Sequence, residues 1–214
     1  MNLLAHGYLS TVPDSPITDD LLVGNFLGDF IKGAPTHPRH ALTPAVIVGI
    51  RLHRTIDTFT DSHAEVALVR HRLHPRCHKY AGVAVDVFFD HFLSRHFTEL
   101  TGQDLTSFTD YYYSTLRQRA ADSISRFPEP ARRMLAAMIQ HRNAGTDWIL
   151  DYATFAGIDR SLRGISRRTR FPSGLETAVL DLETYYEEFE AAFRRFWPTL
   201  VAHVAGQPAI PDIR

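Results

Sequence analysis

The sequence predicts an all-α protein, built as one compact helical bundle. Apolar residues recur at helical spacing along most of the chain, and segments rich in Pro, Gly and Asp separate them. Strand-like alternation with hairpin turns is missing. The chain has 214 residues, 44% of them hydrophobic, which is enough for a sizeable core. We find no long linker, so we expect a single domain over residues 1–214.

The first predicted helix spans residues 18–33. Its stretch LLVGNFLGDFIKG is apolar nearly all round except at Asn25 and Asp29, which is typical of a buried helix. The second predicted helix spans residues 43–60 and has Pro44 in its first turn, where proline is favoured.

The rest of the chain also shows helical periodicity. Asp147 is a candidate N-cap, Gly157 a candidate stop signal, and Pro198 is expected to kink or split the last helix. Helices are predicted over residues 80–98, 107–126, 130–141, 148–156, 159–168 and 173–204.

Composition limits the classes of protein that fit. The net charge of -1 argues against a nucleic-acid-binding protein. Nearly all basic residues are Arg, which suits phosphate and carboxylate partners, although a GC-rich genome is an equal explanation. Cys77 is the only cysteine, so no internal disulfide can form. With neither a signal-peptide pattern nor a bilayer-spanning apolar run, we expect a cytoplasmic protein without a membrane partner.

The second predicted helix carries an imidazole and two carboxylates spaced one turn apart. In HRTIDTFTD, His53, Asp57 and Asp61 follow one another at intervals of four, so they share a helix face. Imidazole and carboxylate groups together suit Mn, Fe or Zn. A helix cap, or a solvated face with a His–Asp hydrogen bond, is the alternative.

Acidic residues also interrupt the apolar helix predicted over residues 80–98. In DVFFDHF, Asp86 and Asp90 are four apart, and His91 adjoins the second. A buried carboxylate needs a partner, which a metal or an Arg side chain can supply. Two helices each carry a His and spaced Asp residues. Together they favour a metal site more strongly than either helix does alone.

Two further polar residues lie in apolar segments. Asp29 adjoins Gly28, which allows another backbone to approach closely, and either metal ligation or capping of a neighbouring helix explains it. His6 lies in NLLAHGYL, where a core histidine with satisfied hydrogen bonds is a more common outcome than a ligand.

Several segments, in the same order, resemble the signature segments of the acyl carrier protein phosphodiesterases. They are MNLLAH, GNFLGDFIKG, GIRLHRTIDTFTDSH, VDVFFDHFLSRHF and DWILDYATFAGIDRSLRGISRR. The resemblance implies an all-helical fold that diverges from the HD-domain phosphohydrolases. It also implies hydrolysis of the phosphodiester between 4'-phosphopantetheine and a serine of acyl carrier protein, giving the apo-carrier and free 4'-phosphopantetheine.

The resemblance implies a divalent cation, Mn first, with Mg, Fe or Zn as alternatives. Carried over residue by residue, the matching segments give His53 and Asp57, then Asp29, and then Asp86, Asp90 and His91. Of these we expect His53, Asp57 and Asp86 to be the preferred ligands, with Asp29 next. The cation would activate a water molecule for attack on phosphorus.

Other residues are assigned to proton transfer and to phosphate binding. We expect Asp61 or His91 to move protons. Arg51 and Arg54 flank His53 and are expected to hold the phosphate, with surface salt bridging as the alternative.

An acyl carrier protein is acidic, so its docking face on this chain should be basic. Arg167 and Arg168, with Arg170, form the densest basic run, and such charges steer encounter. No nucleic-acid partner is expected, and the oligomeric state stays open.

Two other functions fit the same residues. The first is a metal phosphohydrolase acting on a nucleotide or small phosphodiester. The second is a non-catalytic carrier-binding module with a degenerate site, which the full set of His and Asp positions argues against.

Overall fold

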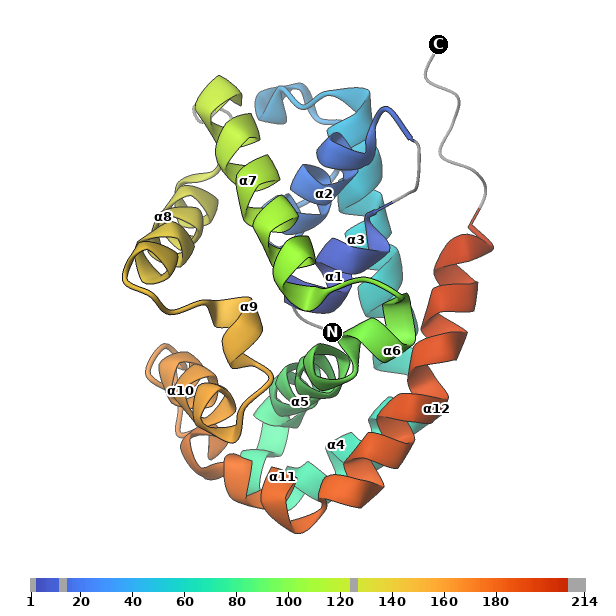
Figure 1. Ribbon diagram of the computed structural model, residues 1–214, viewed down its shortest axis with the longest axis vertical. Coiled ribbons are helices and arrows are strands. Elements are labelled where there is room, and N and C mark those ends of the chain that lie inside the picture. The colour runs from blue at the N-terminus through green and yellow to red at the C-terminus, as the bar shows by residue number, and fades with distance from the viewer. Residues whose placement is uncertain (1–2, 12–14, 124–126, 208–214) are drawn as a thin grey trace.

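The structure is a computed structural model that describes residues 3–11, 15–123 and 127–207, and every regular element in these ranges is helical (Figure 1). The predicted all-α fold is therefore confirmed. None of these helices is long and apolar enough to cross a membrane. The α-helices are α1 (Leu3–Leu9), α2 (Thr18–Leu27), α3 (Pro44–Ser62), α4 (Ala64–Cys77), α5 (Ala81–Arg95), α6 (Phe97–Thr101), α7 (Leu105–Ser123), α8 (Glu129–Asn143), α9 (Trp148–Asp151), α10 (Phe155–Ser166), α11 (Val179–Thr184) and α12 (Tyr186–Ala205).

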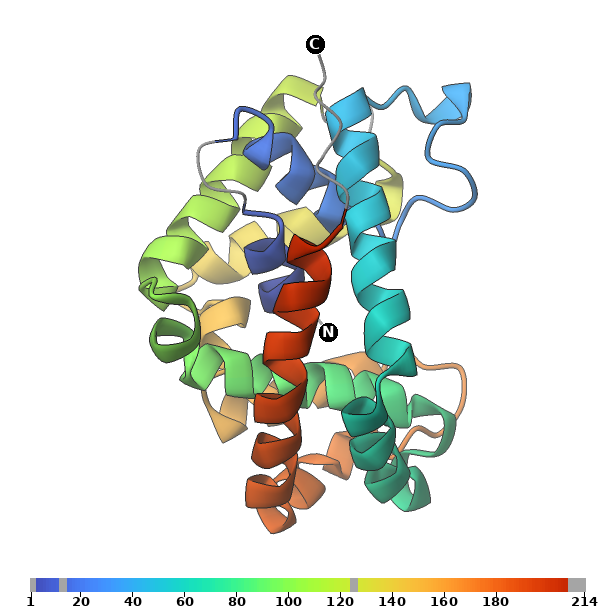
Figure 2. The ribbon, with the colours of Figure 1, turned by 90° about the vertical axis from the view of Figure 1, so that its right-hand side faces the viewer.

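Helix α5 forms the centre of the core and is buried on nearly all sides. Its Phe88 and Phe89 pack against Phe189 and Phe193 of α12, with ring centroids 5.9 and 5.5 Å apart. Such aromatic pairs add to the free energy gained by burying apolar area. Helix α12 also runs beside α3 and α4 (Figure 2). These contacts give α3 and α5, which carry most of the candidate site, a fixed frame.

Helices α2 and α3 touch backbone to backbone at two glycines. A Cβ on Gly24 would lie 2.1 Å from the carbonyl oxygen of Val46, and one on Gly49 would lie 2.3 Å from that of Leu21. No side chain fits at such distances, so glycine is required at both positions. The crossing brings the end of α2 against the middle of α3, where the chemically interesting residues lie.

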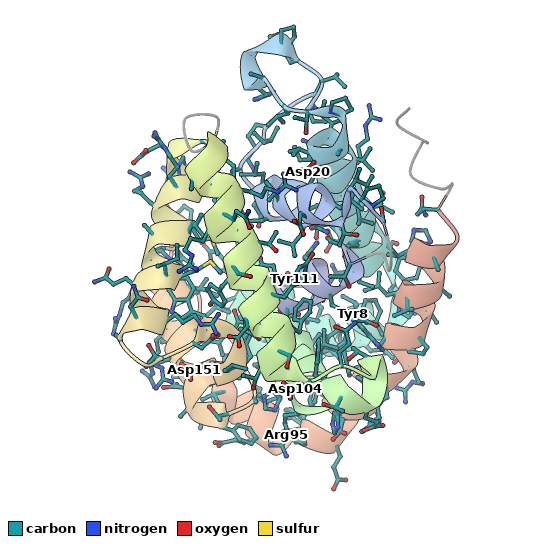
Figure 3. All side chains as sticks on the ribbon, turned by 45° about the horizontal axis from the view of Figure 1, so that its top comes forward. Tyr8, Asp20, Arg95, Asp104, Tyr111 and Asp151 are labelled. Carbon is teal, nitrogen blue, oxygen red and sulfur yellow. The ribbon has the colours of Figure 1, made fainter. Side chains whose placement is uncertain are left out.

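Helix α7 covers α2 on one side of the molecule. The Tyr111 hydroxyl donates a hydrogen bond to Asp19 at 2.8 Å, and Arg119 pairs with Asp20 at 3.5 Å. Tyr111 and Asp20 are both seen on this side (Figure 3). Both acidic residues in the first turn of α2 are thus bonded to side chains of α7, which fixes α7 against α2.

The first predicted helix is too long. Helix α2 ends at Leu27, because Gly28 turns the chain and donates its N–H to the carbonyl of Asn25. Asp29 therefore lies in a turn with its side chain 75% exposed, and the prediction that it sits on a buried helix is wrong.

Other boundaries also differ from the sequence prediction. Helix α4 was not predicted, because its many His and Arg residues and Pro75 obscure the apolar positions Val66, Val69 and Leu73. Predicted helix 80–98 ends at Arg95. Predicted helix 107–126 runs to Ser123, and its expected end at Arg126 lies outside the described residues.

The last part of the chain is divided more finely than expected. The 3-10 turn η4 (Leu175–Thr177), α11 and α12 replace the single helix predicted over residues 173–204. Pro198 lies inside α12 and does not split it. Thr154 caps α10, since its hydroxyl oxygen accepts from Gly157 N–H at 3.0 Å. Gly157 therefore lies in the first turn of α10, so the expected stop at this residue is wrong, and predicted helix 148–156 ends at Asp151.

Candidate metal centre

A cavity of about 330 Å³ collects polar side chains from α1, α2, α3 and α5. Helix α1 contributes His6, α2 contributes Asn25, and α5 contributes Asp86. The apolar part of its wall includes Val83 and Ile165. Segments far apart in sequence therefore meet at one site.

Helix α3 supplies a stripe of cavity-lining residues at helical spacing: His53, Asp57, Thr60 and Asp61. The predicted start of this helix is correct, since Thr43 caps it and Pro44 follows. The Thr60 hydroxyl is buried and has no hydrogen-bond partner among the described residues. Its oxygen has almost no accessible surface, so a molecule in the cavity would reach it only after the side chain rotates.

Helix α1 is anchored so that His6 reaches the cavity. Asp90 of α5 accepts a hydrogen bond from the backbone N–H of Leu4 at 2.9 Å, which satisfies a free donor at the start of α1. Gly7 lies against the ring of Tyr112, where a Cβ would come within 2.7 Å. The sequence predicts that a buried Asp90 needs a partner, and the backbone N–H of Leu4 is that partner.

Asn25 holds both imidazole rings through one oxygen atom. Its Oδ1 lies 2.8 Å from Nδ1 of His6 and 3.0 Å from Nδ1 of His53. Its Nδ2 donates to the backbone carbonyl of His6 at 3.0 Å and to the Ser10 hydroxyl at 2.7 Å. Because a carbonyl oxygen only accepts, this network fixes the orientation of the amide. Both rings therefore carry a proton on Nδ1.

The two Nε2 atoms converge on the carboxylate of Asp57. His6 Nε2 lies 3.1 Å from Asp57 Oδ1, and His53 Nε2 lies 3.0 Å from Oδ2. The rings themselves stack with centroids 4.2 Å apart. With Nδ1 protonated, a neutral ring presents a lone pair at Nε2, which repels a carboxylate oxygen. A proton or a metal cation is therefore required between them.

This arrangement fits a divalent metal ion. One ligand atom from each of His6, His53 and Asp57 lies within 4.8 Å of the others. Imidazole nitrogen and carboxylate oxygen form a donor set that suits Mn, Fe or Zn. Metal-binding histidines also usually donate their second ring N–H to a fixed acceptor, as both rings do here to Asn25.

The pKa values of His53 and Asp57 favour a positive charge on His53 beside the carboxylate of Asp57. Burial acts to lower the pKa of His53, but its hydrogen bonds to Asp29 and Asp57 and the charges of these groups outweigh burial and raise it to about 9. Burial acts to raise the pKa of Asp57, but hydrogen bonds to His53 and His6 hold it well below its usual range. Burial lowers the pKa of His6. A bound cation would replace the proton on His53.

Asp29 and Asp86 extend the acidic lining on two sides. Asp29 Oδ1 lies 3.4 Å from His53 Nε2, and this hydrogen bond lowers the pKa of Asp29. Burial, with the charges of Asp57 and Asp61, raises the pKa of Asp86. The structure thus brings all the predicted ligands and Asp61 to one cavity, but the closest group contains His6 in place of Asp29 and Asp86.

Several predicted site residues lie away from this cavity. His91 is buried beside Tyr152 and Tyr186, with Nδ1 2.7 Å from the Tyr152 carbonyl and Nε2 3.2 Å from the Tyr186 hydroxyl. Burial lowers its pKa to about 4. Arg54 donates to the carbonyls of Ile31 and Gly33 at 2.8 and 2.9 Å, so it holds the turn that carries Asp29.

The remaining predicted arginines lie on the surface. Arg51 is exposed on α3 and does not line the cavity. Arg167 and Arg168 are also exposed, and they follow directly after the end of α10, where Ile165 lines the cavity. None of these three arginines lines the cavity.

Sequence reasoning missed the roles of His6, Asn25 and Thr60. Each is a polar residue at a position that the fold buries. Asn25 was visible as a polar interruption of an apolar helix, and that interruption was the available signal. The role of Asn25 depends on the packing of α1, α2 and α3 against one another. The spacing of residues within one segment cannot predict that packing.

The fold and the site together define an all-helical protein with a candidate metal centre of imidazole and carboxylate groups. The sequence profile of the acyl carrier protein phosphodiesterase family matches residues 1–200. The chain belongs to this family.

Individual relatives agree over nearly the whole chain. An acyl carrier protein phosphodiesterase of Photorhabdus laumondii is 32% identical over 202 residues, which cover 94% of this chain and 93% of the relative. One from an Enterobacter species is also 32% identical, covering 94% and 96%. One from Escherichia coli is 29% identical over 206 residues, covering 96% and 98%. No solved structure shows significant similarity.

Proposed function

We propose that this protein hydrolyses the phosphodiester between 4'-phosphopantetheine and a serine of acyl carrier protein, releasing the apo-carrier and free 4'-phosphopantetheine. The names of its relatives give the substrate class. The single observation that carries the proposal is the convergence of His6, His53 and Asp57 at a polar cavity.

We further propose that His6, His53 and Asp57 hold a divalent cation, with Mn first and Mg, Fe or Zn as alternatives, and that Asp29 and Asp86 are additional carboxylate ligands. A bound cation would lower the pKa of a water molecule and polarise a phosphoryl oxygen. Asn25 would keep both Nε2 atoms directed toward the cation, because its Oδ1 accepts a hydrogen bond from each Nδ1–H group.

Other residues in or near the cavity take part in proton transfer, phosphate binding and positioning. A carboxylate oxygen of Asp61 accepts the proton of the attacking water. After rotation of its side chain toward the cavity, the Thr60 hydroxyl would donate a hydrogen bond to the phosphate, since it has no partner within the described chain. Arg54 acts indirectly, because it fixes the turn that carries Asp29.

The test is release of 4'-phosphopantetheine from holo-carrier, followed by mass spectrometry with and without added Mn. Turnover should require the cation in wild type, and Asp57→Ala and Asp57→Asn should lose at least about 100-fold in rate while circular dichroism shows an intact fold. Asp20→Ala is the matched control, because Asp20 pairs with Arg119 outside the cavity.

A panel of nucleotides and small phosphodiesters, run in parallel, tests the competing substrate class. Equal rates for wild type and Asp57→Ala would remove Asp57 from the active site. Hydrolysis of nucleotides without hydrolysis of holo-carrier would replace the proposed substrate.

A further inference from the structure

A positively charged groove lies outside the candidate metal centre, where α4 meets α5. Its volume is about 360 Å³, and no acidic residue of the described chain lines it. Arg70 and Lys79 supply the permanent charges, and the other polar side chains in its wall are His71, His74 and His78. The groove therefore attracts a negatively charged group.

The two faces of α4 differ in how their arginines are paired. Arg72 turns toward α12 and pairs with Glu188 at 3.0 Å. Arg70 lies in the groove and forms no ion pair with any carboxylate in residues 3–11, 15–123 or 127–207, and the same holds for Lys79. The cations that stabilise the fold are thus separate from those that the groove presents.

An exposed aromatic ring joins this groove to the basic segment after α10. The ammonium of Lys79 lies 3.9 Å from the ring centroid of Phe171, and the guanidinium of Arg170 lies 5.4 Å from the same centroid. Phe171 is 50% exposed. Figure 2 shows the segment that follows α10 passing beside the junction of α4 and α5. Charges from distant parts of the sequence therefore form one surface.

This surface and the cavity are close to one another along α5. Gly82 lines the groove, and Asp86, four residues later on the same face of α5, lines the cavity. On the opposite side, Ile165 lines the cavity, and Arg167 follows two residues later. A partner lying in the groove would reach the cavity within about one helical turn.

We propose that the groove of Arg70 and Lys79, extended by Arg170 and Phe171, is the docking surface for an acidic helical face of the carrier protein. The inference rests on the proposed function, which makes a carrier protein the substrate. A chain of net charge -1 presents here a local patch of unpaired cations beside an exposed ring. That combination suits a folded acidic protein, which buries the ring while its carboxylates meet the cations.

The first experiment reverses the charges of the groove. In Arg70→Glu/Lys79→Glu, KM for holo-carrier should rise about 10-fold or more at low ionic strength, while kcat changes little. The neutral variant Arg70→Gln/Lys79→Gln should give a smaller rise. Hydrolysis of the small diester bis(4-nitrophenyl) phosphate should be unchanged, since neither residue lines the catalytic cavity.

Arg95→Glu is the matched control for charge. Arg95 ends α5, about 20 Å along the helix from the groove, and is exposed (Figure 3). When both variants are compared at about 0.1 M salt, it should leave KM within about twofold of wild type, because the Debye length there is about 10 Å, half of this separation.

Binding is then measured separately from hydrolysis. Calorimetry with holo-carrier and Asp57→Ala protein should give a Kd that weakens about 10-fold or more when the groove charges are reversed. An unchanged Kd and KM would overturn the docking proposal, and so would groove-dependent binding of RNA or anionic vesicles without binding of carrier. Groove-dependent binding of a carrier that is never hydrolysed would contradict the proposed function alone. Hydrolysis with an unchanged KM would contradict only the docking surface.

Discussion

Asn25 sets the proton positions of two imidazole rings. Its Oδ1 accepts from both Nδ1 atoms, and its Nδ2 is occupied by His6 carbonyl oxygen and by Ser10. This arrangement leaves both Nε2 atoms aimed at Asp57. A single amide side chain thus decides which ring atoms are available to a cation.

Replacement of Asn25 should weaken metal binding more than folding. In Asn25→Leu the two Nδ1–H groups lose their acceptor, so we expect affinity for Mn to fall about 10- to 100-fold. Calorimetric titration of chelator-treated protein measures this, with circular dichroism as a check of folding. Ser10→Ala is the control, because it removes only the hydroxyl that Nδ2 contacts; if Asn25→Leu bound Mn as tightly as Ser10→Ala does, Asn25 would have no orienting role.

Where one helix contains the pattern, the sequence correctly predicts which side chains share a face. His53, Asp57 and Asp61 repeat every four residues, and all three do line one cavity. His6 was missed because its role depends on α1 meeting α3. His91 was grouped with the site by adjacency to Asp90, although neighbours along a helix point about 100° apart.

At the scale of elements, the crossing of α2 and α3 sets the distance between Asn25 and His53. The two backbones meet at Gly24 and Gly49, and Gly28 leaves space for the His53 ring, since a Cβ there would lie 2.2 Å from its Cγ. Three glycines thus determine how closely the helices approach and where the imidazole sits.

Gly49→Ala should destabilise the fold and disturb the centre. The added Cβ would press on the Leu21 carbonyl, so we expect a loss of about 1–3 kcal/mol in the free energy of unfolding and weaker Mn binding. Urea unfolding and metal titration measure the two effects.

Gly164→Ala is the matched control within a helix. Nothing lies within 4 Å of the position of its Cβ, so alanine should stabilise by about 0.5–1 kcal/mol. Equal stabilities for the two variants would contradict the tight crossing.

Helix periodicity predicted most elements, but composition hid one of them. Helix α4 buries Val66, Val69 and Leu73 at helical spacing, yet histidine, arginine and an internal Pro75 made it look like a loop. The end of α2 at Leu27 was missed for a different reason, because the apolar residues Phe30 and Ile31 continue the pattern beyond the turn. The residue at which such a helix ends depends on tertiary contacts, and hydrophobic periodicity contains no information on these.

At the scale of the whole molecule, buried histidines make stability depend on pH in both directions. The folded-state pKa of His53, about 9, lies above its usual 6.5, so its contribution is complete below about pH 6.5 and is lost as pH rises through 9. The folded-state pKa of His91, about 4, lies below 6.5, so stability is lost as pH falls from 6.5 toward 4. His6, whose pKa burial also lowers, adds to the acid side.

Chelator-treated protein should therefore be most stable near pH 6.5. Each side of the profile should amount to a change on the order of 3 kcal/mol, measured by urea unfolding from pH 4 to 9. His53→Gln should flatten the alkaline side, and His91→Gln should reduce the acid side. A flat profile for the wild type would contradict both assignments.

His6 and Asp57 are 51 residues apart along the chain, and their side chains meet only once α1 and α3 have packed together. The unfolded chain has no comparable binding site, so an ion that fits the centre would bind only the native state. It would then stabilise the bundle by linking α1 to α3. At a hundred times its Kd such an ion adds about 2.7 kcal/mol. The rise in melting temperature with Mn, Mg, Fe and Zn would thus show which ion the centre binds most tightly. This measurement needs no carrier protein.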